Sequence, residues 1–386
     1  MFIIEKPYAS EFLIDSIVQN DWPVLDNDVI KQAEIEQGAF DLLPSEVAKN
    51  YYLTQEFPLI YSNSEAATNW IMENLPESNL SDYIQFCKDK TVFRETLKEL
   101  YPDFYFASFD KEELKKVNTA DIQFPVVLKP AIGFFDMGVH EIKTASEWKD
   151  AVSAIEKELK QAETMYAENV INSSKFLVEQ MIEGEEFAID AYYDRDGEPV
   201  ILNIYQHPFL KGKNGGSRVY LMSTGIMIGY MAKFGILLRE IGNLKNIKNF
   251  PMHIELRVRE DGEIFPIEIN PIHFASWCVS DIAKYVWGIN VYDCYYKQKK
   301  PDWNKILSLA GRNVFYSISA EITPDIDKKS IHGFEYERYL GNFSNILEVR
   351  RINPRHNPLA AIVFGSTSHK EEILKILALK TKDYVS

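Results

Sequence analysis

The chain has 386 residues, of which 46% are apolar and 13% aromatic, and its formal net charge is −15. This length exceeds what one compact core usually holds, so we expect two to four domains or lobes. Proteins that bind nucleic acid or anionic membranes normally carry an excess of basic residues, so the acidic balance disfavours both kinds of partner.

Three cysteines, Cys87, Cys278 and Cys294, make an odd number and have no metal-site spacing. They predict a reducing, cytoplasmic location, and neither a disulfide framework nor a zinc site. The N-terminus lacks the basic segment and long apolar run of a signal peptide. The longest apolar-rich run, 225–238, contains Lys233 and is too short to span a bilayer, so it predicts a buried helix.

Strand and helix patterns alternate over the first part of the chain. A strand is predicted at 1–5, followed by a helix that ends at about Asn20. Ser62 and Glu65 have capping-box spacing, which predicts a helix over about 64–75. Another helix is predicted over 90–100. This alternation favours an α/β lobe.

The middle of the chain consists of short strand patterns around one long helix at about 145–170. Turns at Asp196-Gly197 and Asp261-Gly262 each join two strand patterns and predict two β-hairpins. The predicted strands are 124–130, 138–144, 176–181, 185–194, 199–209, 252–259 and 263–270, and then 314–322 and 359–365 before a final helix near 370–380. The pattern indicates α/β and α+β lobes with antiparallel sheets at the centre, rather than one doubly wound sheet.

Polar side chains lie on one face of the second predicted hairpin. In IFPIEINP (264–271), Phe265, Ile267 and Ile269 alternate with Glu268 and Asn270, which therefore point to the opposite face.

The partner strand of this hairpin adds Glu255, with Arg257 on the same face. Two carboxylates and an amide oxygen are ligands that Mg²⁺ prefers, with phosphate oxygens and water completing the octahedron. The alternative is a solvated sheet face, because most carboxylates lie at the surface.

Further polar residues occur where strands end. Lys129 closes FPVVLK before a turn and can reach a phosphate as a point charge, and Arg94 is a weaker basic candidate on a helix. FLVEQMIEGEEF breaks at Gly184, so it can offer backbone groups to an adenine edge and the Glu186 carboxylate to ribose hydroxyls. Solvated side chains and an ordinary strand–turn–strand are the alternatives for these residues.

Other catalytic signatures are missing from the sequence. It has no GxxxxGK[ST] loop, no GxGxxG after a strand and no GxSxG. His253 and His273 fall beside the carboxylate hairpin, where each is either structural or catalytic.

The order of three segments is more specific than any one of them. FPVVLKPAIGFFDMGV, FLVEQMIEGEEFAIDAYY and MHIELRVREDGEIFPIEINP together resemble the ATP-grasp superfamily, and within it the carboxylate–amine ligases. The resemblance covers about 85–300. It implies an ATP-grasp fold with an N-terminal α/β lobe (1–88), a small subdomain with a phosphate lid (89–180), a large subdomain with a metal site (181–300) and a C-terminal α+β lobe (301–386).

The resemblance also implies roles for individual residues. Lys129 and Arg94 would contact the α- and β-phosphates of ATP, and Glu186 would bind the ribose. Adenine would be framed by Glu179, Gln180 and Ile182. Mg²⁺, for which Mn²⁺ can substitute, would be held by Glu255, Glu268 and Asn270. In the family, a carboxylate attacks the γ-phosphate to give an acylphosphate, from which an amine then displaces phosphate.

The sequence departs from the family in three places. Ile272 follows Asn270-Pro271 where many relatives carry Arg, so Arg257 or Arg218 would have to stabilise the intermediate. Asp136 stands in the lid where a small residue is usual. Phe274-Ala275-Ser276-Trp277 replaces a frequent Gly-Gly, and Trp277 could shape the acceptor pocket.

The basic, glycine-rich loop 207–218 is either a second closing loop, with Lys211, Lys213 and Arg218 as contacts, or a solvated hairpin extension. The function expected from the resemblance is an ATP- and Mg²⁺-dependent ligase that joins a small carboxylate to an amine, such as amino acids or short peptides. An ATP-grasp phosphotransferase and a non-catalytic nucleotide-binding regulator remain as alternatives. A homodimer is expected from base rates alone.

Overall fold

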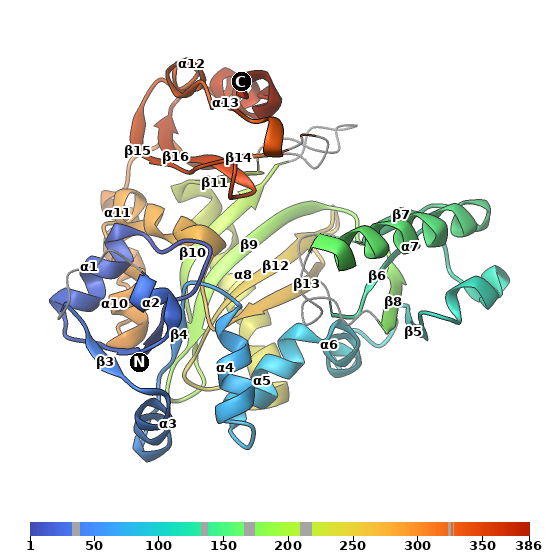
Figure 1. Ribbon diagram of the computed structural model, residues 1–386, viewed down its shortest axis with the longest axis horizontal. Coiled ribbons are helices and arrows are strands. Elements are labelled where there is room, and N and C mark those ends of the chain that lie inside the picture. Colours follow the sequence, from blue (N-terminus) through green and yellow to red (C-terminus); the bar gives the residue numbers. More distant parts are fainter. Residues whose placement is uncertain (33–38, 133–137, 166–173, 209–217, 323–325, 327) are drawn as a thin grey trace.

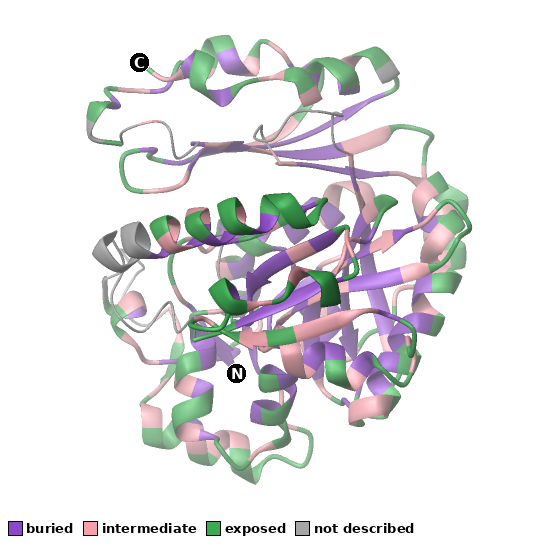
Figure 2. Ribbon diagram, turned by 90° about the vertical axis from the view of Figure 1, so that its right-hand side faces the viewer, coloured by how far each residue is buried: buried purple, intermediate pink, exposed green. Residues whose placement is uncertain are grey.

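Three β-sheets organise the computed structural model of the chain (Figure 1). The structure describes residues 1–386 except 33–38, 133–137, 166–173, 209–217, 323–325 and 327. The inner strands of all three sheets are largely buried, several edge strands are partly exposed, and the helices expose their outer faces (Figure 2). The combination of a parallel sheet with two antiparallel ones confirms the predicted α/β and α+β class.

The N-terminal sheet is parallel, with the strand order β3-β2-β1-β4. Its strands are β1 (Phe2–Ile3), β2 (Pro23–Leu25), β3 (Asp41–Leu43) and β4 (Tyr61–Ser62). The first helix, α1 (Glu11–Gln19), begins where the Ser10 hydroxyl accepts a hydrogen bond from the Leu13 N–H, and it buries Leu13 and Ile17. The alternation predicted for the N-terminal lobe is therefore correct.

The small antiparallel sheet has the order β5-β8-β6-β7. Its strands are β5 (Phe106–Asp110), β6 (Val126–Pro130), β7 (His140–Ile142) and β8 (Lys175–Gln180). Helix α7 (Trp148–Met165) packs Trp148, Val152 and Ile155 into the same apolar core as the strands. This sheet forms the green lobe of Figure 1.

The large sheet has eight strands in the order β13-β12-β9-β10-β11-β14-β16-β15, all antiparallel to their neighbours. The strands are β9 (Glu185–Tyr193), β10 (Pro199–His207), β11 (Arg218–Met222), β12 (Phe250–Val258), β13 (Ile264–Pro271), β14 (Val314–Glu321), β15 (Ile346–Arg351) and β16 (Leu359–Thr367). Both predicted hairpins are present as β9–β10 and β12–β13. Their turns place Gly197 and Gly262 at φ of 89° and 87°, where a side chain would be strained.

The remaining α-helices cover the sheets. They are α2 (Asp28–Gln32), α3 (Ser45–Thr54), α4 (Ala67–Asn74), α5 (Asn79–Lys88), α6 (Lys90–Leu97), α8 (Thr224–Lys245), α9 (Ala283–Val286), α10 (Val291–Tyr296), α11 (Trp303–Leu309), α12 (Tyr336–Leu340) and α13 (Lys370–Ala378). In Figure 2 the C-terminal helices form a layer over the end of the large sheet.

Two local predictions need correction. The capping box at Ser62 and Glu65 does not form: the Ser62 hydroxyl accepts from Ser64 N, and Glu65 pairs with Lys88 instead of reaching back, so α4 begins at Ala67 without a side-chain cap. The apolar run 225–238 belongs to the longer helix α8, which buries only one face on the sheet. Ile228 remains 64% exposed on the other face.

No helix among the described segments combines the length and apolarity needed to cross a bilayer.

Candidate active site

The hairpin β12–β13 brings the three predicted metal ligands together. Glu255 pairs directly with Glu268 across the two strands, and Asn270 lies opposite His253, one step further along. A β-bulge between Glu255 and Leu256 leaves Ile267 without a paired residue on β12, so the strict alternation predicted for this strand is interrupted there. Glu268 and Asn270 nevertheless remain on one face, because the bulge precedes both of them.

The two facing carboxylates have opposite pKa shifts. Burial raises the pKa of Glu255 above its ordinary value, and the negative charge of Glu268 raises it further. Burial also acts to raise the pKa of Glu268, but the ammonium groups of Lys90 and Lys129 outweigh it, so this pKa is lowered. Two carboxylates that face each other on neighbouring strands repel, so a cation bound between them would be stabilised by both.

Lys90 is a site residue that the sequence analysis missed. Its Nζ lies 3.1 Å from Glu268 Oε2. Burial alone would lower the pKa of Lys90, but Glu268 raises it above its ordinary value. Lys90 is the first residue of α6, because the Asp89 carboxylate accepts from Thr91 N (2.8 Å) and caps the helix. Lys90 could have been found from the sequence, because Asp89 is a typical helix N-cap residue and Lys90 directly follows it.

Lys129 and Arg94 meet on a buried carboxylate. Glu179 on β8 accepts from Lys129 Nζ at 2.7 Å and from Arg94 Nε at 2.5 Å. Burial would raise the pKa of Glu179, but the two cations lower it to about 2. The ammonium of Lys129 has a lowered pKa, because burial outweighs the attraction of Glu179.

The structure places Arg94 behind this carboxylate. Its side chain is 3% exposed, and Nη1 donates to the Pro266 carbonyl of β13 at 2.8 Å, so α6 lies between β8 and β13 (Figure 1). The rings of Phe93 and Phe104 lie 5.3 and 4.5 Å from the guanidinium. Arg94 therefore supports Glu179 from a buried position, and its predicted contact with phosphates stays a prediction. Lys90, beside Glu268, is a further cation of the candidate site.

The predicted adenine hinge consists of the last two residues of β8, Glu179 and Gln180, and of Ile182 just after it. Gln180 is already engaged, since its Oε1 accepts from Tyr105 N at 3.0 Å, while the Ile182 carbonyl accepts from Arg257 Nη1 at 2.6 Å. Gly184 has φ 131°, and a Cβ there would lie 2.2 Å from the Val258 carbonyl oxygen. Only glycine fits where the backbone at residue 184 passes so close to Val258. This close approach holds the segment against the end of β12.

Glu186 lies between two basic side chains from neighbouring strands. Its carboxylate contacts His207 Nδ1 at 2.9 Å and Arg257 Nη2 at 2.9 Å. Burial acts to raise the pKa of Glu186, but His207 and Arg257 lower it below its ordinary value. Arg257 is thus held by Glu186 and the hinge carbonyl. The second predicted catalytic arginine, Arg218, begins β11 and lowers the pKa of Glu255 electrostatically.

Several predicted residues lie outside the described part of the chain. They are Asp136 with most of the lid, and Lys211 and Lys213 in the loop that precedes β11.

The donors at β12–β13 fit a hard cation only together with a ligand. Within the described residues, no three His, Cys, Asp or Glu side chains are grouped as a metal centre of their own. The facing Glu255 and Glu268 carboxylates and the Asn270 amide supply oxygen donors, which suit Mg²⁺ when phosphate oxygens and water complete its shell.

Comparison with known proteins agrees with this geometry. Residues 122–281 match the model of the ATP-grasp domain family. Within these residues the chain is similar to an ATP-grasp domain. The matched region begins before β6 and ends after β13, so it contains Lys129, Glu179, Glu186, Glu255 and Glu268.

Solved structures extend the likeness to the whole chain. An L-amino acid ligase from Bacillus licheniformis is 16% identical, with TM-score 0.66, over 100% of this chain and 97% of that one. Biotin carboxylase from Campylobacter jejuni is 11% identical, with TM-score 0.62, over 100% and 91%. N5-carboxyaminoimidazole ribonucleotide synthetase from Thermotoga maritima is 14% identical, with TM-score 0.59, over 100% and 98%. At such identities the likeness shows the ATP-grasp fold alone. No curated protein sequence matches the chain.

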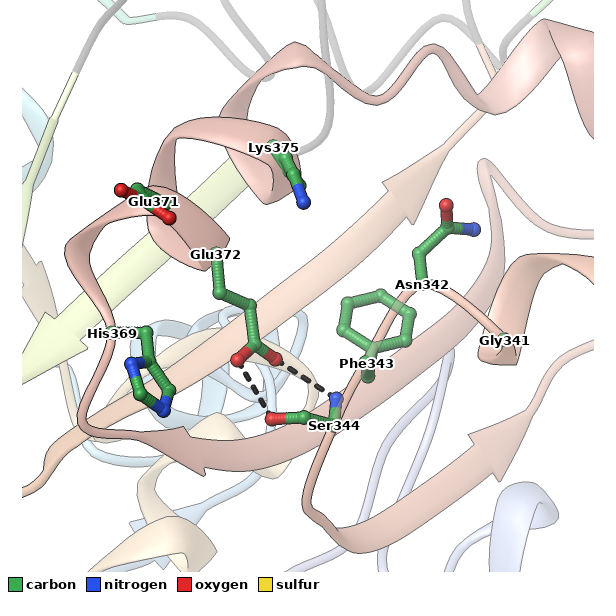
Figure 3. A pocket seen from close by; sticks show the side chains of 8 residues that line it. All are labelled: Gly341, Asn342, Phe343, Ser344, His369, Glu371, Glu372 and Lys375. Atoms are coloured by element: carbon green, nitrogen blue, oxygen red, sulfur yellow. Dashed lines mark hydrogen bonds between the residues drawn. The ribbon is translucent and has the colours of Figure 1, made fainter.

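A surface pocket lies in a different part of the molecule. It is formed by residues 341–344 and by α13 with the residue before it, and there Glu372 accepts from the backbone and hydroxyl of Ser344 (Figure 3). The Glu372 carboxylate is satisfied by these hydrogen bonds. The pocket includes no residue of the candidate active site.

Proposed function

We propose that the protein is an ATP-dependent ligase that joins a small carboxylate to an amine through an acylphosphate, releasing ADP and phosphate. The observation that carries the proposal is the facing pair Glu255 and Glu268 with the buried ammonium groups of Lys90 and Lys129 beside it. The likeness in fold to an L-amino acid ligase over nearly the full length of both chains supports amino acids or short peptides as substrates.

The nucleotide would lie between the small sheet and the large sheet. In this proposal the hinge backbone from Glu179 to Ile182 faces adenine and the Glu186 carboxylate accepts from the ribose hydroxyls. Lys129 and Lys90 would neutralise phosphate charge, and Arg94 holds Lys129 in place through Glu179. Glu186 would have to share its charge with His207 and Arg257, because both already contact it.

Mg²⁺, or Mn²⁺ in its place, would be held by Glu255, Glu268 and Asn270, and it would supply positive charge to the phosphate oxygens. The chain's own residues then have three tasks: they bind the nucleotide, orient the attacking carboxylate and exclude water. Arg218 and Arg257 remain the proposed groups for stabilising the tetrahedral intermediate, because Ile272 occupies the position of the family arginine.

The domain boundaries at 88/89, 180/181 and 300/301 remain a proposal, as does a homodimer. The three cysteines are free and buried, as a reducing compartment would allow.

The test is ADP release from Mg-ATP with a panel of amino acids, supplied singly and in pairs. A ligase requires two substrates and yields a new amide detectable by mass spectrometry. A stable phosphorylated product formed from one carboxylate would instead establish a phosphotransferase. Tight ATP binding without ADP release for any pair would contradict catalysis on these substrates.

Glu268→Ala tests the site itself. We expect ADP release to fall at least about 100-fold while the fold is retained, because this carboxylate faces both Glu255 and Lys90. Glu263→Ala is the matched control, since Glu263 lies in the turn before β13 and its side chain is exposed. Normal turnover in Glu268→Ala would overturn the assignment of the metal ligands.

A further inference from the structure

The segment that follows the metal-binding strand has a strained backbone. Ile272, Trp277 and Cys278 have φ of 62°, 60° and 54°, in the left-handed region that side chains other than glycine rarely adopt. Ile272 is β-branched, which makes this conformation still less favourable. Trp277 and Cys278 are consecutive and interrupt the 3₁₀ segment Ser276–Ile282. Such outliers persist only where the surrounding structure enforces them, and they are frequent at functional sites.

Arg350 of β15 enforces the second part of this conformation. Its Nη1 donates to the carbonyl oxygens of Trp277 (3.1 Å) and Cys278 (2.8 Å), and its Nη2 lies 2.6 Å from Asp281 Oδ2. The guanidinium is therefore bonded to both left-handed residues at once. Its Nε also donates to Glu348 at 2.7 Å, and the side chain is only 6% exposed.

The N-terminal lobe contacts the same segment from the other side. Ser62 N, at the end of β4, donates to the Ile272 carbonyl at 2.9 Å. The ring of Tyr8 stacks on Trp277 with centroids 6.0 Å apart, and it lies 5.7 Å from the Arg350 guanidinium. The flanking lobes thus meet on the residues that directly follow Asn270.

Hydrogen bonds connect this segment to His253, which lies beside the proposed metal ligand Glu255. Ala275 N donates to Asp190 Oδ1 at 2.8 Å, and the same oxygen lies 2.7 Å from His253 Nδ1. The other ring nitrogen of His253 lies 3.9 Å from Glu255 Oε1. Asp190 is fully buried, and its other carboxylate oxygen accepts from the Tyr205 hydroxyl and from Asn203 Nδ2 (3.3 Å). A displacement of residues 272–278 would therefore remove one contact of Asp190 but leave Asp190 and His253 held by the large sheet.

We infer that Arg350 is a positioning residue: it holds residues 272–278 in their left-handed conformation and thereby shapes the site of the carboxylate and amine substrates, while ATP binds independently of it. This inference rests on the proposed ligase function. Glycine would reach such a conformation without help, whereas this chain has larger residues there and holds them with a cation from the C-terminal lobe. The ATP contacts proposed above all lie on other elements.

The test uses Arg350→Lys in the full chain. Lysine keeps the positive charge beside Asp281 but lacks the planar fork that reaches two carbonyls. We expect the KM for the active amino-acid pair to rise about tenfold, as loss of one charge-assisted hydrogen bond predicts. The dissociation constant of Mg-ADP, measured by calorimetry, should change by less than about twofold, within ordinary scatter for an uncoupled site. Backbone hydrogen exchange should accelerate in the peptide 272–282.

A second substitution at Cys278 should reverse the effect of Arg350→Lys only if Arg350 acts by holding the backbone. In the Arg350→Lys background, Cys278→Gly should restore KM and slow exchange, because glycine adopts the left-handed conformation without strain, whereas Cys278→Ala should restore neither. If Arg350→Lys fails to fold, recovery of the folded protein by glycine and not by alanine supports the same inference. Arg351→Lys is the control, because Arg351 is the next residue but its side chain is 57% exposed.

Unchanged exchange in 272–282, equal rescue by glycine and alanine, or a parallel loss of Mg-ADP affinity would each overturn the role of Arg350. Absence of ADP release from the wild-type protein would overturn the proposed function and the substrate role with it, while the exchange measurement still decides whether Arg350 holds the segment.

Discussion

Single residues at the candidate site are best understood by what each charge faces. Lys129 and Arg94 were both predicted to contact phosphates, but they occupy different layers. The ammonium of Lys129 is held by Glu179 Oε1, while Arg94 lies behind Oε2 and reaches the β13 backbone. A sequence gives the spacing of basic residues along a helix but not the depth to which each is buried. The sequence analysis therefore considered Arg94 on this helix and missed Lys90.

Glu179→Gln tests the buried charge cluster. Removing this carboxylate leaves Lys129 and Arg94 buried without a counter-charge, so the free energy of unfolding should fall by about 3–5 kcal/mol. The measurement is chemical denaturation at neutral pH. Glu198→Gln is the control, because Glu198 also pairs with an arginine, Arg239, but at the surface, where such a pair contributes about 0–1 kcal/mol. Similar losses in the two variants would contradict the buried cluster.

The pH dependence follows from the same residue. The pKa of Glu179 falls from 4.5 to about 2 on folding, because Arg94 and Lys129 outweigh burial. A depressed carboxyl pKa contributes stability that is present above pH 4.5 and is lost as the pH falls towards 2. The wild-type protein should therefore lose more stability over this window than Glu179→Gln does.

At the scale of elements, local patterns predicted more than distant pairings. The hairpins β9–β10 and β12–β13 were predictable because strand, turn and strand are adjacent in sequence. Pairing of β11 with β14 was not, since nothing in either strand encodes a partner about a hundred residues away. The bulge at Ile267 was hidden for a related reason, because register is fixed by the partner strand. The three metal-ligand candidates were found because they lie on one hairpin.

Helix α6 gives a prediction about capping. Asp89→Ala removes the cap that positions Lys90, which should cost about 1 kcal/mol and raise the KM for ATP. Ser78→Ala removes the corresponding cap of α5 and should cost a similar amount without changing that KM. Asp89→Asn keeps a capping oxygen without the charge, so it should resemble the wild type. Equal kinetic effects of the alanine variants at Asp89 and Ser78, measured by initial rates, would exclude a specific role for the α6 terminus.

Helix α8 gives a prediction about packing. A Cβ at Gly242 would lie 2.4 Å from the Tyr193 ring. This ring is buried, and its hydroxyl donates a hydrogen bond to the Leu238 carbonyl, so it has little room to move. Gly242→Ala should therefore lower the free energy of unfolding by about 1–3 kcal/mol. Gly229→Ala, on the same helix with open space around its Cβ, should raise it by about 0.5–1 kcal/mol. Thermal denaturation of both variants measures the contrast, and a stabilised Gly242→Ala would show that α8 packs differently.

At the scale of the whole molecule, the large sheet crosses a proposed lobe boundary. Strands β9–β13 carry the candidate site, and β14–β16 belong to the segment after residue 300, yet β11 and β14 pair over five residue positions. The N-terminal and C-terminal lobes also meet at Trp277, through Tyr8 and Arg350. The flanking segments therefore contact the residues that directly follow the candidate site.

Gly365→Ala tests whether the C-terminal strands unfold together with the site. A Cβ at Gly365 would lie 2.4 Å from the ring of Tyr316, its direct partner on β14, so the variant should be destabilised by about 1–3 kcal/mol. Because the sheet is continuous, denaturant unfolding should remain one transition, with hydrogen exchange in 185–207 and in 346–367 shifting together. Gly311→Ala, with open space around its Cβ, is the control. Early unfolding of 346–367, with 185–207 unaffected, would mean that the two parts of the sheet unfold separately although their strands are paired. The C-terminal lobe would then contribute to the site only through contacts such as that of Arg350.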